Sequence, residues 1–411
     1  MKRLLAPLVA LAAAFALASC RPQTEVAPAR LAEDVRPAPA APPTDLEQLA
    51  ERLVTQSAAV REGDIVLVSG GPENIELLEN VAVQVRRAGA FPLVTVSTDR
   101  LSRRLYTDVP EKYDAQTDRL ELRLAETVNA AIFVGRETAE GLFADADPKR
   151  MAARAEAGEA VQDAYNKHGV RVVEVGNGLY PQEWLARRYG MTRDELAKTF
   201  WGGVNVDYTG LQARGAQVSA ALAAGDEIHI RDANGTDLRV RVAGRPYGVS
   251  DGIISAEDVK KGPAGQGVYL PAGEVYVTPV PGTAEGRVVR AKDYYQGKEI
   301  NGLTMTFAAG RLTSLTGSGP GFALMKAAYD AAGEGKDLFA VVDFGINPNV
   351  RLPAGSPIAT WVPAGTVTVG VGNNVWAGGD NKSAYGYFVS LPGTTVTLDG
   401  RPVVEAGQLK L

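Results

Sequence analysis

Residues 365–391 read GTVTVGVGNNVWAGGDNKSAYGYFVSL, which places two short strands around one glycine-rich loop. Apolar and small residues alternate from Val367 to Val371, and this alternation predicts a strand. The residues from Gly378 to Asn381 are typical of a loop, and residues 385–391 predict a second strand. Two strands that face each other across such a loop bring their side chains together at one point. Few of these side chains can bind a metal or transfer a proton.

This stretch resembles the metallo-aminopeptidase family that includes aminopeptidases T and S. In that family the first strand carries a His, the loop carries Asn-x-Ser, and the second strand carries His-x-Asp. The loop matches here, with Asn381 and Ser383 at the expected positions. The three metal-ligand positions are substituted, since Thr368 and Gly386 stand in place of the two His and Phe388 stands in place of the Asp.

Two upstream segments are also similar to the family. Residues 271–279 read PAGEVYVTP and match a Pro-x-Gly-Glu-Val-aromatic-x-x-Pro segment, whose ligand Glu carries over onto Glu274. Residues 345–348 match a Gly-x-Asn-Pro segment that follows another ligand Glu. Without a gap that Glu falls on Val341, whereas Asp343, on the same face of a strand, replaces it only after a local shift. The resemblance covers residues 45–411 and implies a metal-dependent aminopeptidase that uses zinc, cobalt or manganese. It also implies a homodimer formed through the C-terminal part.

Composition narrows the function classes. The chain has 411 residues, a net charge of −5, one Cys and two His. The charge gives no indication of nucleic-acid binding, and a single Cys excludes an internal disulfide. Two His leave little material for a His-based metal site or a catalytic triad. His229 is expected on a solvated strand face, and His168 near the C-terminus of a helix.

The first 44 residues predict export and lipid anchoring. Residues 1–19 have a basic start and a short apolar run that is typical of a signal peptide. The residues before Cys20 resemble the bacterial lipoprotein cleavage box, so Cys20 is the expected lipidation site. A lipid on Cys20 is expected to anchor the protein to the bilayer of the cell envelope. The alternative is an ordinary signal peptide that contains a Cys. Residues 20–44 are rich in Pro and Ala and predict an extended tether.

The remaining chain predicts two domains. Short apolar strands alternate with helices over residues 45–225, which predicts an α/β domain with a doubly wound, mostly parallel sheet. Its first helix is expected to be capped by Thr44. From Asp226 to Leu411 alternating strands and glycine-rich turns predict a mainly antiparallel β domain with one helix, as in aminopeptidase T. The boundary is expected between Ala224 and Asp226.

Three groups of residues in the C-terminal part are candidates for a functional site. Glu274 is a metal ligand by resemblance, or else a surface Glu at the start of a strand. Asn373 and Asp380 flank the substituted positions and carry oxygen atoms that suit a hard cation such as calcium. The nearby aromatic residues form either ordinary core packing or a stacking platform in the inherited cleft; they are Trp361, Trp376, Tyr385, Tyr387 and Phe388.

Two functions follow from these residues. A catalytic zinc site takes at least three protein ligands, and the sequence offers Glu274 and Asp343. We therefore expect a non-catalytic, lipid-anchored protein that holds a peptide or small molecule. Its cleft is expected to include Asn373, Trp376, Asp380, Asn381, Ser383 and Tyr385. The alternative is an active aminopeptidase with a rearranged metal site.

Overall fold

The computed structural model describes residues 44–135, 139–143, 145–261, 265–383 and 385–411. The predicted signal peptide, Cys20 and the tether up to residue 43 lie outside these residues. Within the described part of the chain, every helix is too short or too polar to cross a membrane.

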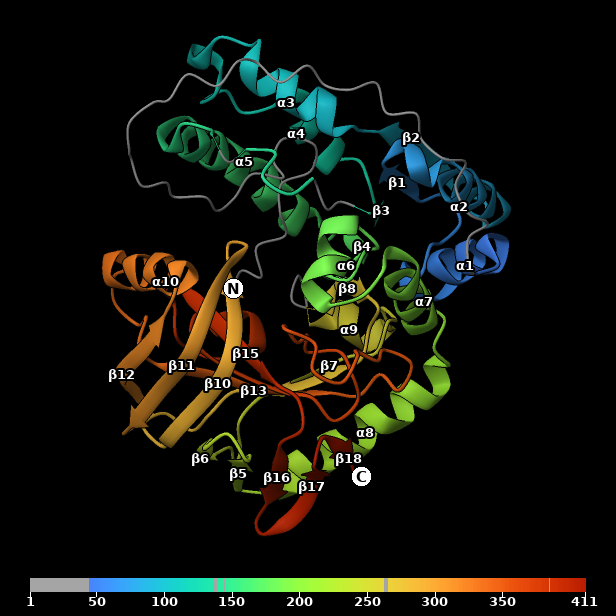
Figure 1. The fold of residues 1–411 in the computed structure, drawn as a ribbon. Coiled ribbons are helices and arrows are strands. Elements are labelled where there is room, and N and C mark those ends of the chain that lie inside the picture. The colour runs from blue at the N-terminus through green and yellow to red at the C-terminus, as the bar shows by residue number, and fades with distance from the viewer. Residues whose placement is uncertain (1–43, 136–138, 144, 262–264, 384) are drawn as a thin grey trace.

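A five-stranded sheet with the order β2-β1-β3-β4-β8 forms the centre of the first part of the chain (Figure 1). All neighbouring strands in it run parallel, which confirms the predicted doubly wound sheet. The last strand comes from beyond residue 225, so the chain returns to the parallel sheet after the predicted domain boundary. The strands are β1 (Ile65–Gly70), β2 (Phe91–Val96), β3 (Ala130–Val134), β4 (Arg171–Val175) and β8 (Gly267–Leu270).

Helices cover both faces of this sheet, because a parallel strand buries side chains on both sides. Val66 and Val68 of β1 belong to the large core that includes the first two helices, whereas Leu67 belongs to a smaller core on the opposite face. The helices of this part are α1 (Leu46–Arg52), η1 (Leu53–Ser57), η2 (Pro72–Asn74), α2 (Ile75–Arg87), α3 (Asp99–Thr107), η3 (Glu111–Tyr113), α4 (Arg119–Ala125), α5 (Pro148–His168), α6 (Glu183–Tyr189), α7 (Arg193–Val204) and α8 (Tyr208–Ala224).

The helix starts follow local capping chemistry. The expected cap at Thr44 is wrong, because Asp45 caps α1 and its Oδ1 accepts from the backbone N–H of Glu47 at 3.0 Å. The Thr44 hydroxyl instead accepts a hydrogen bond from the Asn205 side chain. A carboxylate reaches the free N–H groups of the first turn as well as a hydroxyl does, so the sequence allowed either residue.

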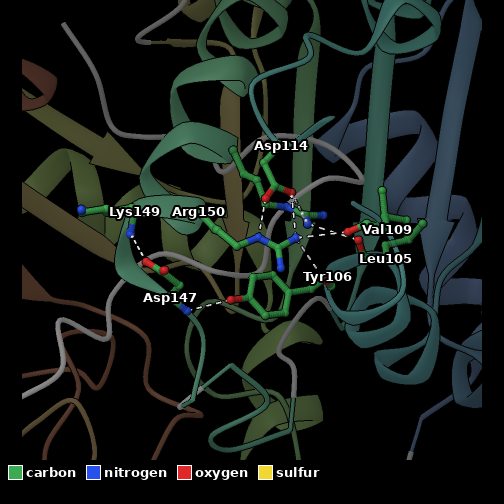
Figure 2. A network of polar contacts seen from close by, with 8 residues as sticks. Leu105, Tyr106, Val109, Asp114, Asp147, Lys149 and Arg150 are labelled. Carbon is green, nitrogen blue, oxygen red and sulfur yellow. Dashed lines mark hydrogen bonds and ion pairs between the residues drawn. The ribbon is translucent and has the colours of Figure 1, made fainter. Parts of the chain in front are cut away.

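A network of polar contacts joins α3, η3 and α5 (Figure 2). The Asp114 carboxylate is almost fully buried and accepts from Arg150 Nε at 2.5 Å and from Arg154 Nη1 at 3.0 Å. The Arg150 guanidinium also lies 4.3 Å from the centre of the Tyr106 ring. One buried carboxylate therefore holds two arginines of α5 against the end of α3.

The second sheet has eight antiparallel strands in the order β12-β11-β10-β6-β5-β16-β17-β18. It confirms the predicted antiparallel β structure after residue 226. Its strands are β5 (Glu227–Arg231), β6 (Asp237–Arg241), β10 (Glu285–Tyr295), β11 (Lys298–Ala308), β12 (Arg311–Ser318), β16 (Thr395–Leu398), β17 (Arg401–Glu405) and β18 (Gln408–Leu409). The helix α10 (Pro320–Ala331) packs against β10, β11 and β12, and α9 (Ala256–Lys260) is a short helix before β8.

The third sheet is antiparallel, with the order β15-β14-β13-β9-β7. One of its faces joins the large core through residues such as Val275, Val342 and Val369. Since side chains alternate along a strand, the other face carries the residues between these. The strands are β7 (Tyr247–Ser250), β9 (Glu274–Val277), β13 (Phe339–Gly345), β14 (Val367–Gly372) and β15 (Gly386–Leu391), and the short helix η5 (Val375–Ala377) follows β14.

Candidate functional site

Strand register brings the two predicted metal-binding carboxylates to one face of the third sheet. Asp343 of β13 lies opposite Tyr276 of β9 and opposite Thr368 of β14, while Glu274 lies opposite Gly345. Glu274 and Asp343 are therefore diagonal neighbours on the same face, and such neighbours have backbones about 7–8 Å apart. Both side chains are buried, with 4% and 5% of their surfaces exposed.

The positions at which the family resemblance expects the other ligands lie on this same face. Thr368 is opposite Ser390 of β15, and the two hydroxyl oxygens are 2.8 Å apart. Phe388 and Gly386 precede Ser390 at intervals of two residues, so their positions point to the same side. Val341 also lies two residues from Asp343. We call this surface the Glu274 face, defined by Glu274, Tyr276, Val341, Asp343, Thr368, Gly370, Gly386, Phe388 and Ser390.

Aromatic rings fill much of the Glu274 face. A Cβ added at Gly370 would lie 2.3 Å from Cδ1 of Phe388, so the Phe388 ring rests directly on the glycine backbone. Trp376 packs edge-on against this ring with centroids 6.0 Å apart, and its centroid lies 5.1 Å from that of Tyr276. Phe388 remains 38% exposed. The face therefore carries a row of three rings, with one open to solvent, beside two buried carboxylates.

Of the five aromatic residues predicted near the site, Trp376 and Phe388 lie on this face. Tyr385 packs edge-on against Tyr329 of α10, and Tyr387 donates its hydroxyl to Asp293 at 3.0 Å, both on the other side of the sheet. Trp361 packs against the large core. Tyr276 completes the row, and sequence reasoning missed it, although strand alternation with Glu274 gives the signal.

The predicted loop residues hold the loop in place. Asn381 Nδ2 donates to the carbonyl oxygens of Gly335 and Gly372, each at 2.7 Å. Ser383 Oγ accepts from the backbone N–H of Tyr385 at 3.1 Å. Asn373 Oδ1 accepts from the N–H of Val375, and its Nδ2 donates to Ser383 O. These bonds position η5 and therefore Trp376.

The two other residues predicted as cation ligands each contact a different partner. Asp380 is exposed, and its Oδ2 lies 3.5 Å from Arg245 Nη2, while the side-chain oxygen of Asn373 is used within the loop. Neither histidine lies on the third sheet: His229 on β5 lies 2.7 Å from Asp237, and His168 ends α5.

The donor set on the Glu274 face does not fit a catalytic zinc or two-metal site. Within the described residues, no group of three or more His, Cys, Asp or Glu side chains is arranged to hold a metal ion. The face supplies two carboxylates and the hydroxyls of Thr368 and Ser390, which are bonded to each other. A catalytic zinc site uses three strong protein ligands, so one more is needed here.

Comparison with known proteins identifies the family of this chain. The family model described as thermophilic metalloprotease (M29) matches residues 43–328, more than half of the chain. The chain belongs to this M29 family. The match includes Glu274 and ends before β13, so the strands that carry Asp343 and the substituted positions lie beyond it.

Two solved structures are similar to this chain in fold. Wild-type AmpT from Thermus thermophilus is 18% identical, with a TM-score of 0.66, and the match covers 89% of this chain and 99% of that one. A 2,5-dihydroxypyridine dioxygenase from Pseudomonas putida KT2440 is 15% identical, with a TM-score of 0.50 and coverage of 89% and 96%. A search of curated proteins found no match. At such identities the likeness shows the fold, and the activity has to be argued from the site.

Proposed function

We propose that this protein is a lipid-anchored member of the M29 family that holds a peptide or small molecule on the Glu274 face and does not cleave it. Cys20 anchors it to the bilayer of the cell envelope, and the tether of residues 20–44 separates the folded part from the membrane. The aromatic row of Tyr276, Trp376 and Phe388 supplies the contact surface for the ligand.

One observation supports this proposal above the others. The Phe388 ring covers Gly370 at the place where the family resemblance expects a metal-binding Asp. An aromatic ring is no metal ligand, and it offers a flat apolar surface on which a ligand can stack. The exposed part of Phe388 lies beside Trp376, so both rings can contact the same ligand.

The alternative is an active aminopeptidase with a rearranged metal site. The adjacent placement of Glu274, Asp343 and Thr368 favours it, because two carboxylates and a hydroxyl offer oxygen ligands on one face. Zinc, cobalt or manganese bound there would supply a Lewis acid and an activated water.

Metal content and peptidase activity separate the two functions. We expect the purified protein to hold no stoichiometric zinc, cobalt or manganese after dialysis, and to release no amino acids from short peptides with added metal. One metal per chain, lost in Glu274→Ala and kept in the control Glu334→Ala, would establish the alternative. Glu334 is an exposed Glu of the same part of the chain, which makes it a matched control.

Ligand binding tests the non-catalytic function directly. Short peptides with an aromatic residue are titrated while the tryptophan fluorescence is recorded. We expect Phe388→Ala to weaken binding by about 10-fold, which corresponds to about 1.4 kcal/mol, within the range of a lost aromatic contact. The exposed Tyr113→Ala serves as the control and leaves binding unchanged.

A further inference from the structure

A cavity of about 360 Å³ lies away from the Glu274 face, where α8, the loop after β13 and the last strand meet. Arg214 comes from α8, Val350 and Arg351 come from the loop, and Gln408, Leu409 and Leu411 come from the end of the chain. Figure 1 shows β18 and the C-terminus beside α8. Three segments that are distant in sequence therefore form one cavity.

Helix α8 places this cavity on the other side of the third sheet. A Cβ added at Gly215 would lie 2.8 Å from Val249 of β7, so the helix packs closely there. Val249 is opposite Val275 in the register, whereas its neighbour Ser250 is opposite Glu274. Since adjacent residues of a strand point to opposite faces, the cavity and the Glu274 face are separate sites.

The loop that forms one wall is held rigidly. Asn347 Nδ2 donates to the carbonyl oxygens of Gly203 at 3.0 Å and Ala272 at 2.6 Å, and its Oδ1 accepts from the N–H of Asn349 at 2.9 Å. The Arg351 side chain begins four residues later, and its Nε donates to Pro348 O at 3.2 Å. The arginine is therefore presented by a fixed backbone, which lowers the entropy cost of binding.

The side chains that line the cavity carry a net positive charge. Its lining contains two guanidinium groups, of Arg214 and Arg351, and no Asp or Glu side chain. Within the described part of the chain, no carboxylate forms an ion pair with either group. Arg214 is half-buried, so its charge is less well screened by solvent than that of a surface arginine.

We propose that this cavity binds a small organic anion, with a carboxylate or phosphate head on the two arginines and an apolar body against Val350, Leu409 and Leu411. A guanidinium binds either head through paired N–H donors. The cavity volume lies at the lower end of the range for small-molecule pockets. This second site is independent of the function proposed for the Glu274 face.

Calorimetric titration of the full chain in a neutral detergent tests the site, with hexanoate and inorganic phosphate as the probes. We expect hexanoate to bind about one per chain, and Arg214→Gln and Arg351→Gln each to weaken it by about 10-fold or more. Arg401→Gln, an exposed arginine on β17, is the control and leaves the affinity unchanged. Leu409→Ser weakens hexanoate and leaves phosphate unchanged.

The results show whether the site exists and whether its ligand has a carboxylate or a phosphate head. Phosphate binding that matches hexanoate, and that is lost in both arginine variants, supports a phosphate head. Hexanoate binding without phosphate binding supports a carboxylate head. No heat from either probe up to about 10 mM, or equal affinity in the wild type and the folded arginine variants, overturns the site. Where Arg214→Gln lowers the melting temperature, Arg214→Lys keeps the charge and is expected to lose part of the affinity.

Discussion

At the residue scale, three positions decide what the Glu274 face can bind. Thr368 and Phe388 occupy positions where the family resemblance expects ligands, and Gly386 leaves a third position without a side chain. The Thr368 hydroxyl is bonded to Ser390 across the strands. The Phe388 ring takes the space above Gly370. Under the proposed function, these residues therefore offer a ligand an apolar ring instead of metal-binding groups.

Restoring the ligands tests these positions. We expect the triple variant Thr368→His, Gly386→His, Phe388→Asp to bind zinc, because it adds three ligands beside Glu274 and Asp343. Gly386→His alone is expected to bind none, since a Cβ at residue 386 would lie 3.3 Å from the Phe388 ring and the ring blocks the face. Elemental analysis after dialysis measures both. A folded triple variant without zinc would contradict the placement of these positions around one site.

Glu121 on α4 makes stability depend on pH. Burial raises the pKa of its carboxyl to about 7, and the charge of Asp118 adds to this shift. Its Oε2 is buried without a hydrogen-bond partner. Because the pKa is higher in the folded state, the contribution of Glu121 to stability is fully present below pH 4.5 and is lost as the pH rises through 7.

Glu121→Gln is therefore expected to stabilise the protein at pH 8, by on the order of 1 kcal/mol after allowance for solvent screening. The gain should shrink at pH 5, where the wild-type carboxyl is largely protonated. Urea unfolding at both pH values measures it, and Glu159→Gln on the exposed side of α5 is the control. An equal effect of Glu121→Gln at both pH values would exclude a raised pKa.

At the element scale, single polar side chains fix how helices and loops pack. Asn381 ties the loop after β14 to Gly335 and Gly372, and Asn374 Nδ2 donates to Ala340 O on β13 at 3.1 Å. Both bonds satisfy backbone groups that a loop leaves open. These bonds fix the loop to β13 and β14 and place Trp376 over the Glu274 face.

The polar contacts of Asp114 are expected to stabilise the packing of α5 against α3 (Figure 2). Asp114→Asn leaves Arg150 and Arg154 without their shared carboxylate, and we expect a loss of about 2–3 kcal/mol in the free energy of unfolding. Asp145→Asn is the matched control, because its carboxylate pairs with Arg103 but is largely exposed. Its loss should stay below about 1 kcal/mol. Equal losses in both variants, measured by urea unfolding, would show that burial of Asp114 adds nothing.

At the scale of the whole molecule, the two parts of the chain are joined by more than one connection. After α8 the chain builds the first strands of the antiparallel sheets, returns to the parallel sheet as β8, and then enters β9. Leu270 O accepts from the N–H of Gly176 at 2.8 Å, and the Asn177 side chain donates to Pro271 O at 2.8 Å. Three residues separate Glu274 from the end of β8, so the parallel sheet directly positions the start of the Glu274 face.

Anchoring is tested by fractionating cells. We expect Cys20→Ala to move the protein from the membrane fraction to the soluble fraction, or to stop processing of the signal peptide. Stable attachment needs more than one acyl chain. The sequence has one Cys, so Cys20 is the residue expected to carry a thioether-linked lipid. Membrane association that persists in Cys20→Ala after processing would rule out the lipid anchor.

A homodimer is the second expectation at this scale, and it rests on the family resemblance. Light scattering on a protein that starts at Asp45 measures the mass at micromolar concentration. We expect twice the chain mass of 43.4 kDa, less the residues removed. A monomer at this concentration would refute the dimer.

Much of the fold could be read from local sequence patterns. The apolar runs that became β1 to β4 and the capping box of Thr192 and Glu195 at α7 are set by neighbouring residues. Local patterns also located the two strands around the loop at residues 373–385. The cap of α1 was misplaced by one residue because Thr44 and Asp45 are both good caps, and tertiary contact with Asn205 uses Thr44.

The sequence by itself determined which chemical groups are available. It has two histidines, and for a metal site it offers the carboxylates of Glu274 and Asp343 but no third strong ligand. Only the tertiary structure decided which groups meet. Tyr276 of β9 meets Trp376 of η5, whereas Tyr385 and Tyr387 point to the opposite side of the same sheet. The cavity with Arg214 and Arg351 needs three segments far apart in the chain. Local propensity acts over a few residues, while register and packing bring distant residues together, so such sites become visible once the chain has folded.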